Sequence, residues 1–274
     1  MVRKISDAFT PYNKNKLRVL LCHNIAEKDF ATFREKLKWL SKKWNFINVK
    51  DFEEMMNGNK KIIGNNLLLT FDDGFLSDYF VAKEILNPMG ISALFFIISG
   101  YSKLKEKKDQ IAFLEKNLYP KWRGHNIPYN RDDLINMSLE NIEYLIQTGH
   151  EIGFHTTSHQ KLSIINNETD LNDEIIKGAD ELEAALNIKI KHFSFSFGDL
   201  DSFSEKALTT AKSRFKYIYT GMRGNNAKHL THPFAIRRDT IAVTDSNNMV
   251  GIYLLGGADF LYYKKFNIYE SWIK

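Results

Sequence analysis

Cysteine and long apolar runs are both scarce in this sequence. Its 274 residues include a single cysteine, Cys22, so no disulfide can form within the chain and a secreted disulfide scaffold is excluded. Residues 1–16 include basic side chains but no apolar stretch, and the apolar run at 17–22 is short and interrupted by Arg18. These absences predict no signal peptide and no integral membrane segment, so we expect a cytoplasmic protein.

Dense blocks of one charge are also missing. The formal net charge of +5 comes mostly from lysines scattered along the chain. Because no basic stripe or recognised nucleic-acid-binding motif is present, we expect no nucleic-acid partner. A solvated, lysine-rich surface explains this charge, and a phosphate-bearing substrate or an anionic membrane surface is the alternative explanation.

The sequence does contain a regular alternation of apolar runs and amphipathic segments. Apolar runs predict strands at 17–22, 46–49, 67–71, 91–98, 151–155, 191–197, 217–220 and near 234–241. Helical spacing of apolar residues predicts helices at 30–44, 52–56, 78–86, 139–147, 170–186 and 204–213. Ser138 is the expected N-cap of the helix at 139–147. Strands that alternate with helices predict parallel βαβ units, in which active sites lie at the carboxyl ends of the strands.

Two adjacent carboxylates end one of these strands. Asp72 and Asp73 lie in Thr-Phe-Asp-Asp-Gly at 70–74, directly after the apolar run 67–69. They repel each other beside apolar walls, so one of them has to find a cation or take up a proton. A metal ion resolves this conflict if one carboxylate binds it and the other stays free as a base. The alternative interpretation is a helix N-cap followed by a turn at Gly74.

A pair of histidines follows another predicted strand. His155 and His159 are separated by Thr-Thr-Ser, which disfavours the middle of a helix and favours a loop or a helix start, where two imidazoles can converge on a metal. Two imidazoles and one carboxylate leave a coordination position for water, the pattern of an open, catalytic zinc site. His23 is more readily explained as a rim histidine than as a catalytic one. Arg237 and Arg238 either bind an anionic group or pair with surface carboxylates.

Together these motifs resemble the polysaccharide deacetylases of the NodB-homology type, carbohydrate esterase family 4. The family's first motif is Thr-Phe-Asp-Asp-Gly, matched at 70–74, and its second is His-(Ser/Thr)-x-x-His, matched at 155–159. The resemblance extends from about Leu17 to Gly257. It implies an α/β fold, a distorted (β/α) barrel, and a single deacetylase domain over residues 1–274 with an insertion at about 103–137.

The resemblance also implies a metal-dependent hydrolase. Such an enzyme would remove N-acetyl groups from an amino sugar in a glycan or glycan precursor, in surface-polysaccharide biosynthesis. Asp72 would be the catalytic base, and Asp73, His155 and His159 would hold a divalent metal, usually zinc in this family.

The family's later motifs are altered in this chain. The third motif often reads Arg-Pro-Pro-Tyr-Gly, whereas residues 194–198 read Ser-Phe-Ser-Phe-Gly, so the arginine that often orients the catalytic base is missing. The backbone N–H of Phe197 would still take the place of the family's oxyanion donor. The late Leu-x-His motif, which supplies the general acid, is not recognisable, and we assign His232 to that role.

The segment at 103–137 has no clear periodicity and contains several aromatic residues. We expect it to border the substrate groove, with Trp122 or Tyr129 stacking on a sugar. Two other functions stay open: a hydrolase of another amide or of an O-acetyl ester, and a non-catalytic carbohydrate-binding homologue. The missing arginine and acid histidine favour the binding homologue, whereas intact metal ligands beside a base argue against it.

Overall fold

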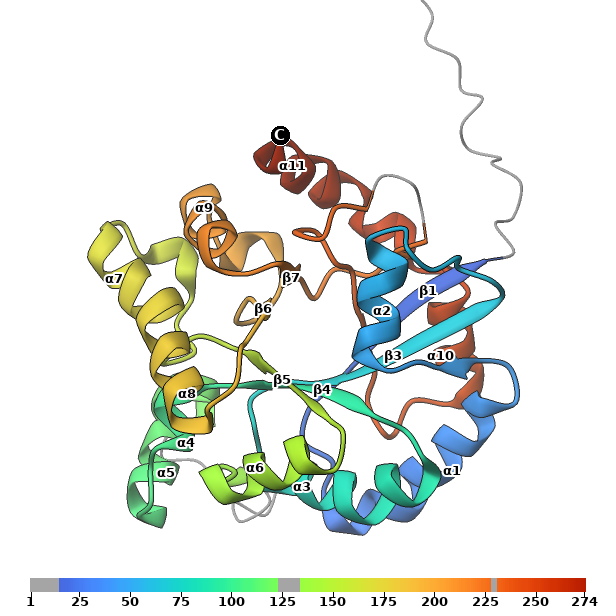
Figure 1. The fold of residues 1–274 in the computed structure, drawn as a ribbon, viewed down its shortest axis with the longest axis horizontal. Helices are drawn as coiled ribbons and strands as arrows, with labels where there is room; N and C mark the ends of the chain where they lie inside the picture. Colours follow the sequence, from blue (N-terminus) through green and yellow to red (C-terminus); the bar gives the residue numbers. More distant parts are fainter. Residues whose placement is uncertain (1–14, 123–133, 228–230) are drawn as a thin grey trace, which may run out of the picture.

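The strands form a parallel sheet that curls around a centre (Figure 1). The computed structural model describes residues 15–122, 134–227 and 231–274. Along the sheet the order is β7-β6-β5-β4-β3-β1-β8, and β2 pairs with β3 outside this path. The strands are β1 (Lys16–Cys22), β2 (Asn45–Phe46), β3 (Asn65–Phe71), β4 (Ala93–Ile97), β5 (Glu151–Phe154), β6 (His192–Ser194), β7 (Tyr217–Tyr219) and β8 (Asp239–Thr240).

Helices cover the outer face of the curled sheet (Figure 1). They are α1 (Phe30–Ser41), α3 (Leu76–Val81), α4 (Ser99–Ser102), α5 (Lys107–Phe113), α6 (Leu139–Gln147), α7 (Glu168–Asn172), α8 (Gly178–Leu186), α9 (Glu205–Arg214), α10 (Asn247–Leu254) and α11 (Tyr263–Ile273). Strands covered on both faces are apolar throughout rather than alternating, which explains the continuous runs seen in the sequence. All of β1, and β3 from its second residue onward, are buried.

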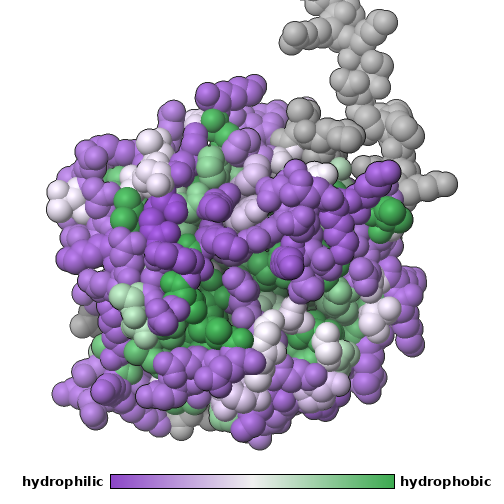
Figure 2. All heavy atoms as spheres, in the orientation of Figure 1, coloured by the Kyte–Doolittle hydropathy of each residue, from purple (hydrophilic) through white to green (hydrophobic). Residues whose placement is uncertain are grey.

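A smaller core fills the inside of the curl. It contains side chains of α2 (Val49–Met56), and the ring of Phe52 stacks on Tyr219 with centroids 6.1 Å apart. Because β2 pairs with the beginning of β3, the helix that follows closes the N-terminal end of the sheet. Figure 2 shows this face, with hydrophobic side chains gathered near its centre and hydrophilic ones around them. The carboxyl ends of the strands therefore lie at the opposite end, away from α2.

The last predicted strand is divided between the two edges of the sheet. Ile236 forms a parallel bridge with Tyr219 of β7, and three residues later the chain reaches β8, where Asp239 pairs with Leu20 of β1. The segment 234–241 is therefore not one continuous strand, because it crosses from one edge to the other. This crossing closes the curled sheet into a distorted barrel, as expected.

The helix predictions are largely confirmed, with two differences. The helix predicted at 78–86 begins at Leu76 as α3 and continues as a π-helical turn over Ala82–Leu86. Ser138 caps α6 in a capping box with Asn141, as expected. The helix predicted at 170–186 is interrupted by a wider, π-helical turn, Asp173–Lys177, between α7 and α8.

The described part of the segment at 103–137, residues 103–122 and 134–137, contains more regular structure than the sequence predicted. It contains α5 and a π-helical turn, Leu114–Leu118, whose Leu114 and Leu118 pack in a small core with Phe75 and Tyr101. Tyr129 and the side chain of Trp122 lie outside the described residues. The single-domain boundary stays a prediction. Among the helices of the described residues, none is both long enough and apolar enough to cross a membrane.

Candidate metal-binding active site

The strand register brings the predicted acids and histidines to one edge of the sheet. β1 and β3 pair in parallel with Cys22 opposite Phe71, so His23 and Asp72 leave neighbouring strands together. The Asp72 N–H donates to the Cys22 carbonyl oxygen at 3.1 Å and continues the ladder by one bond. β5 ends one residue before His155, at the same edge. The active-site position expected for parallel βαβ units is therefore where these side chains gather.

A pocket of about 440 Å³ opens at this edge. The segment 103–137 contributes Leu118 and Tyr119 to its wall, which agrees with the expected position of the insertion. The lining residues are Leu21, His23, Asp72, Asp73, Leu118, Tyr119, His155, His159, Phe197, Gly198, Asp199, Gly221, Arg238, Thr240 and Tyr262.

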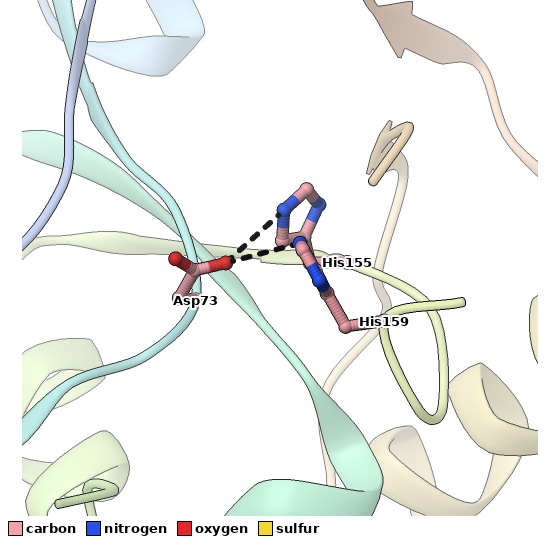
Figure 3. Close-up of side chains that lie close together, drawn as sticks. All are labelled: Asp73, His155 and His159. Atoms are coloured by element: carbon pink, nitrogen blue, oxygen red, sulfur yellow. Dashed lines mark ion pairs between the residues drawn. The ribbon is translucent and has the colours of Figure 1, made fainter. Parts of the chain in front are cut away.

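Asp73, His155 and His159 form a compact cluster in this pocket (Figure 3). Asp73 Oδ1 lies 3.5 Å from His155 Nε2 and 3.4 Å from His159 Nε2. All three side chains are buried. The candidate ligand atoms lie within 4.8 Å of one another, so one ion can reach all three.

The hydrogen bonds of His155 show that this cluster fits a cation. His155 Nδ1 lies 2.9 Å from the carbonyl oxygen of Ser194, so Nδ1 carries a proton and Nε2 faces Asp73. Asp73 Oδ1 is buried and has no hydrogen-bond partner among the described residues. A carboxylate oxygen and an imidazole lone pair that face each other need a proton or a cation between them. One carboxylate and two imidazoles are a ligand set that zinc and other divalent ions accept.

Burial would lower the pKa of His155, but the neighbouring carboxylates of Asp72 and Asp73 raise it. The pKa shifts of Asp73 and His159 favour the protonation states that metal ligands need. Burial lowers the pKa of His159 to about 4, so its imidazole is neutral at neutral pH. Burial opposes ionisation of Asp73, but the nearby imidazoles of His155, His159 and His23 hold the pKa of Asp73 well below its ordinary value. Neutral imidazole and ionised carboxylate are the forms that bind a metal.

Several residues of the site have left-handed backbone conformations. The φ angles are 76° at Asp73, 67° at Thr156, 59° at His159 and 64° at Phe197. Such values cost non-glycine residues about 1–3 kcal/mol each and gather at functional sites when the surrounding structure holds them. Two of these residues, Asp73 and His159, are candidate metal ligands, and Phe197 lines the pocket. This concentration of left-handed conformations supports a functional role for the pocket.

Asp72 differs from Asp73 because it has a dedicated cationic partner. Arg238 Nη1 donates to Asp72 Oδ1 at 2.7 Å, and Arg238 Nη2 donates to Asp72 Oδ2 at 2.8 Å. Both side chains are buried. Burial alone would raise the pKa of Asp72, but Arg238 and His155 hold that pKa below its ordinary value. Asp72 is therefore an ionised carboxylate in a fixed orientation.

The arginine missing from the third motif is thus supplied by another part of the chain. Ser194 stands in the motif's arginine position, and Arg238 Nη2 also donates to its Oγ at 2.6 Å. Arg238 Nε donates to the Thr220 carbonyl oxygen at 2.9 Å. Of the two alternatives left open for Arg238, pairing with a surface carboxylate is therefore wrong, because its carboxylate partner is buried. A signal was present in the sequence, because Arg238 lies in the segment 234–241 that was predicted to be a strand, and an arginine buried in a sheet requires a carboxylate partner.

Comparison with known protein families adds the deciding observation. A sequence model of the family described as "Polysaccharide deacetylase" matches residues 59–215, more than half of the chain. The chain belongs to the polysaccharide deacetylase family. The matched region includes both recognised motifs and ends before Arg238, so the orienting arginine of this deacetylase lies outside it.

Solved deacetylase structures share this fold. The Streptococcus pyogenes deacetylase PplD in complex with acetate has a TM-score of 0.67 at 17% identity, over 87% of this chain and 98% of that one. IcaB from Ammonifex degensii has a TM-score of 0.66 at 19% identity, over 88% and 98%. The de-N-acetylase from Aggregatibacter actinomycetemcomitans has a TM-score of 0.63 at 15% identity, over 86% and 98%. The predicted deacetylase-type barrel is confirmed. A comparison with curated protein sequences found no match.

The structure separates His232, the histidine assigned to proton donation, from His23, which was interpreted as a rim histidine. His23 lines the pocket beside Asp72. His232 instead lies in a different, open groove with Lys212 and Phe234, where the Phe234 N–H donates to His232 Nδ1 at 3.2 Å. The assignment of His232 as general acid is therefore corrected, because its ring contacts another groove, and His23 takes its place as the candidate.

Proposed function

We propose that this chain is a metal-dependent hydrolase that removes N-acetyl groups from an amino sugar. Its substrate would be a glycan or glycan precursor used in the synthesis of a surface polysaccharide. The observation that carries this proposal is the contrast between the two adjacent carboxylates. Asp73 faces two imidazoles with an unpartnered oxygen, whereas Asp72 is held by Arg238 in the same pocket. The fold shared with a de-N-acetylase supports the N-acetyl group as the target.

The two carboxylates suit different parts of an amide hydrolysis. A divalent cation held by Asp73, His155 and His159 would polarise an acyl carbonyl and lower the pKa of a water molecule towards about 7. Asp72 is ionised at neutral pH and accepts the proton of the attacking water as general base. Arg238 keeps this base charged and prevents its carboxylate from rotating.

Two further groups of the pocket complete the reaction. The Phe197 N–H makes no hydrogen bond within the part of the chain that the structure describes, so it is free to donate to the acyl oxygen as negative charge develops. His23 stands beside Asp72 and donates a proton to the departing nitrogen. The products would be acetate and a free amino sugar.

The principal test is acetate release by the zinc-loaded protein. We expect about one divalent ion per chain, acetate from N-acetylated amino-sugar oligomers, and loss of activity after chelation that zinc restores. O-acetylated oligomers and small N-acetyl amides form the other arms of the panel. Activity confined to either of those arms would identify a hydrolase of another bond. Metal binding with tight glycan binding but no acetate would identify a non-catalytic binding homologue.

Replacing His23 with asparagine should lower turnover by about 10²–10⁴-fold, the usual contribution of a positioned acid or base. Metal content should stay unchanged, because His23 is not part of the Asp73 cluster. His232→Asn is the matched control and should retain full activity. Full activity in His23→Asn together with a large loss in His232→Asn would reverse this correction.

A further inference from the structure

The loop between the two histidines of the metal cluster is held by one buried acid. Glu174 lies in the π-helical turn Asp173–Lys177 and is 7% exposed. Its Oε2 accepts the Ser158 N–H at 2.9 Å, and its Oε1 accepts the Ser158 hydroxyl. Gln160 Nε2 donates to the same Oε1 at 3.5 Å. One carboxylate therefore binds both donors of the residue that immediately precedes His159.

The backbone of the same turn holds the preceding residue of the loop. The Thr157 N–H donates to the Glu174 carbonyl oxygen at 3.0 Å, and Thr157 Oγ1 donates to the Asp173 carbonyl oxygen at 2.7 Å. A π-helical turn leaves carbonyl groups without their usual α-helical partners, and such turns are frequent at functional sites. The π-helical turn between α7 and α8 thus supplies carbonyl acceptors to the loop between His155 and His159.

The loop is also packed tightly between two glycines. A Cβ added to Gly178 would lie 2.0 Å from Thr157 Oγ1, and one added to Gly100 would lie 2.4 Å from the Thr157 carbonyl oxygen. The Gly100 N–H donates to that carbonyl at 2.8 Å. The loop therefore has no room to relax on either side of Thr157.

These contacts compensate for an unfavourable loop conformation. Thr156 and His159, at the two ends of the held segment, both have left-handed φ angles. Left-handed residues persist only where neighbouring contacts over-determine them. Without the acceptors of Glu174, the segment would gain conformations in which His159 no longer faces Asp73.

We propose that Glu174 is a positioning residue, which fixes the His155–His159 loop so that both imidazoles face Asp73 before a cation binds. This inference rests on the proposed metal-dependent function and deepens it. Glu174 acts through Ser158 and belongs to neither the metal cluster nor the pocket lining. Groups that orient metal ligands typically change metal affinity by about 10–100-fold when they are removed.

The test is the zinc affinity of the metal-free protein, measured by competition with a chromogenic chelator well below the unfolding temperature. Glu174→Ala should weaken zinc binding by about 10–100-fold. Glu174→Gln should weaken it less, because the amide oxygen still accepts one hydrogen bond. Glu181→Gln is the matched control. Glu181 lies in α8, is exposed and pairs with Lys103, so this variant should bind zinc like the unmodified protein.

Ser158→Ala is a second variant that tests the same contact if Glu174→Ala fails to fold. It removes the hydroxyl but keeps the backbone N–H, so we expect a smaller loss of zinc affinity that does not add to that of Glu174→Ala. Lower thermal stability with unchanged zinc affinity in the Glu174 variants would overturn the inference. Failure of the unmodified protein to bind zinc would instead overturn the proposed function itself.

Discussion

Asp72→Asn should retain the metal and lose most of the turnover. An amide cannot accept the proton of the attacking water, and a positioned base is worth about 10²–10⁴-fold in rate. The metal should stay, because Asp73 and the two imidazoles are unchanged. Zinc content and acetate release, measured on the same preparation, check both parts of this result.

Asp73→Asn is the matched variant and should give the opposite pattern. Its carboxylate oxygen is the one that faces both His155 Nε2 and His159 Nε2, so a neutral amide at this position should weaken zinc binding. The base would remain ionised beside its arginine. Loss of the metal in Asp72→Asn with retention in Asp73→Asn would show that the two roles are exchanged. Full activity in both variants would contradict a deacetylase site here.

Arg238→Met should both destabilise the protein and change its pH dependence. Removing one partner of a buried ion pair typically costs about 3–5 kcal/mol of unfolding free energy, because the remaining charge is left uncompensated. The pKa of Asp72 should rise once Arg238 no longer opposes the effect of burial. Because the base must be ionised, the acid limb of kcat/KM should move to higher pH. Urea unfolding at neutral pH and a pH–rate profile measure these two effects.

The sign of the stability effect follows from the direction of the Asp72 shift. A pKa held below the ordinary value means that the pair stabilises the fold above the pKa of an unfolded aspartate, about 4, and that this contribution is lost as the pH falls further. The difference between Arg238→Met and the unmodified protein should therefore shrink in acid. Arg238→Lys keeps the charge but loses the bidentate geometry, so its unfolding free energy should lie between those of Arg238→Met and the unmodified protein.

Arg237→Met is the neighbouring control for this experiment. Arg237 pairs with Glu270 at 3.3 Å and stacks on Phe266, away from the base. The Arg237→Met variant should leave the acid limb of kcat/KM at its original pH, whatever the effect of the substitution on stability. An identical shift of the acid limb in Arg237→Met would mean that Arg238 does not control the protonation of Asp72.

The features predicted well from the sequence are those whose signal is local. The apolar runs before Asp72 and His155 predicted strands, and parallel strands bring their ends to one edge whatever the loops between them do. Residue chemistry indicated that one of the two aspartates joins the histidines, and the family resemblance implied that it is Asp73. The N-cap at Ser138 needed only the residues of one helical turn.

The features that were missed depend on contacts between distant parts of the chain. Arg238 reaches Asp72 across 166 positions, and nothing near residue 238 indicates which carboxylate it meets. His23 was interpreted as a rim residue because its neighbour in space, Asp72, is set by the β1–β3 register rather than by adjacent sequence. His232 was chosen by residue type alone, and its loop packs against a different groove.

The crossing segment that carries Arg238 has a consequence for how the protein matures. During synthesis from the N-terminus, Asp72 and all three residues of the metal cluster leave the ribosome long before Arg238 does. Until the segment from Ile236 to Asp239 joins β7 to β1, the base has no counter-ion. Joining such distant segments carries a loop-closure entropy, so this step belongs among the slow ones. With the roles proposed above, a nascent chain would possess every metal ligand before Arg238 has reached the base, and catalytic activity would begin only when the barrel closes.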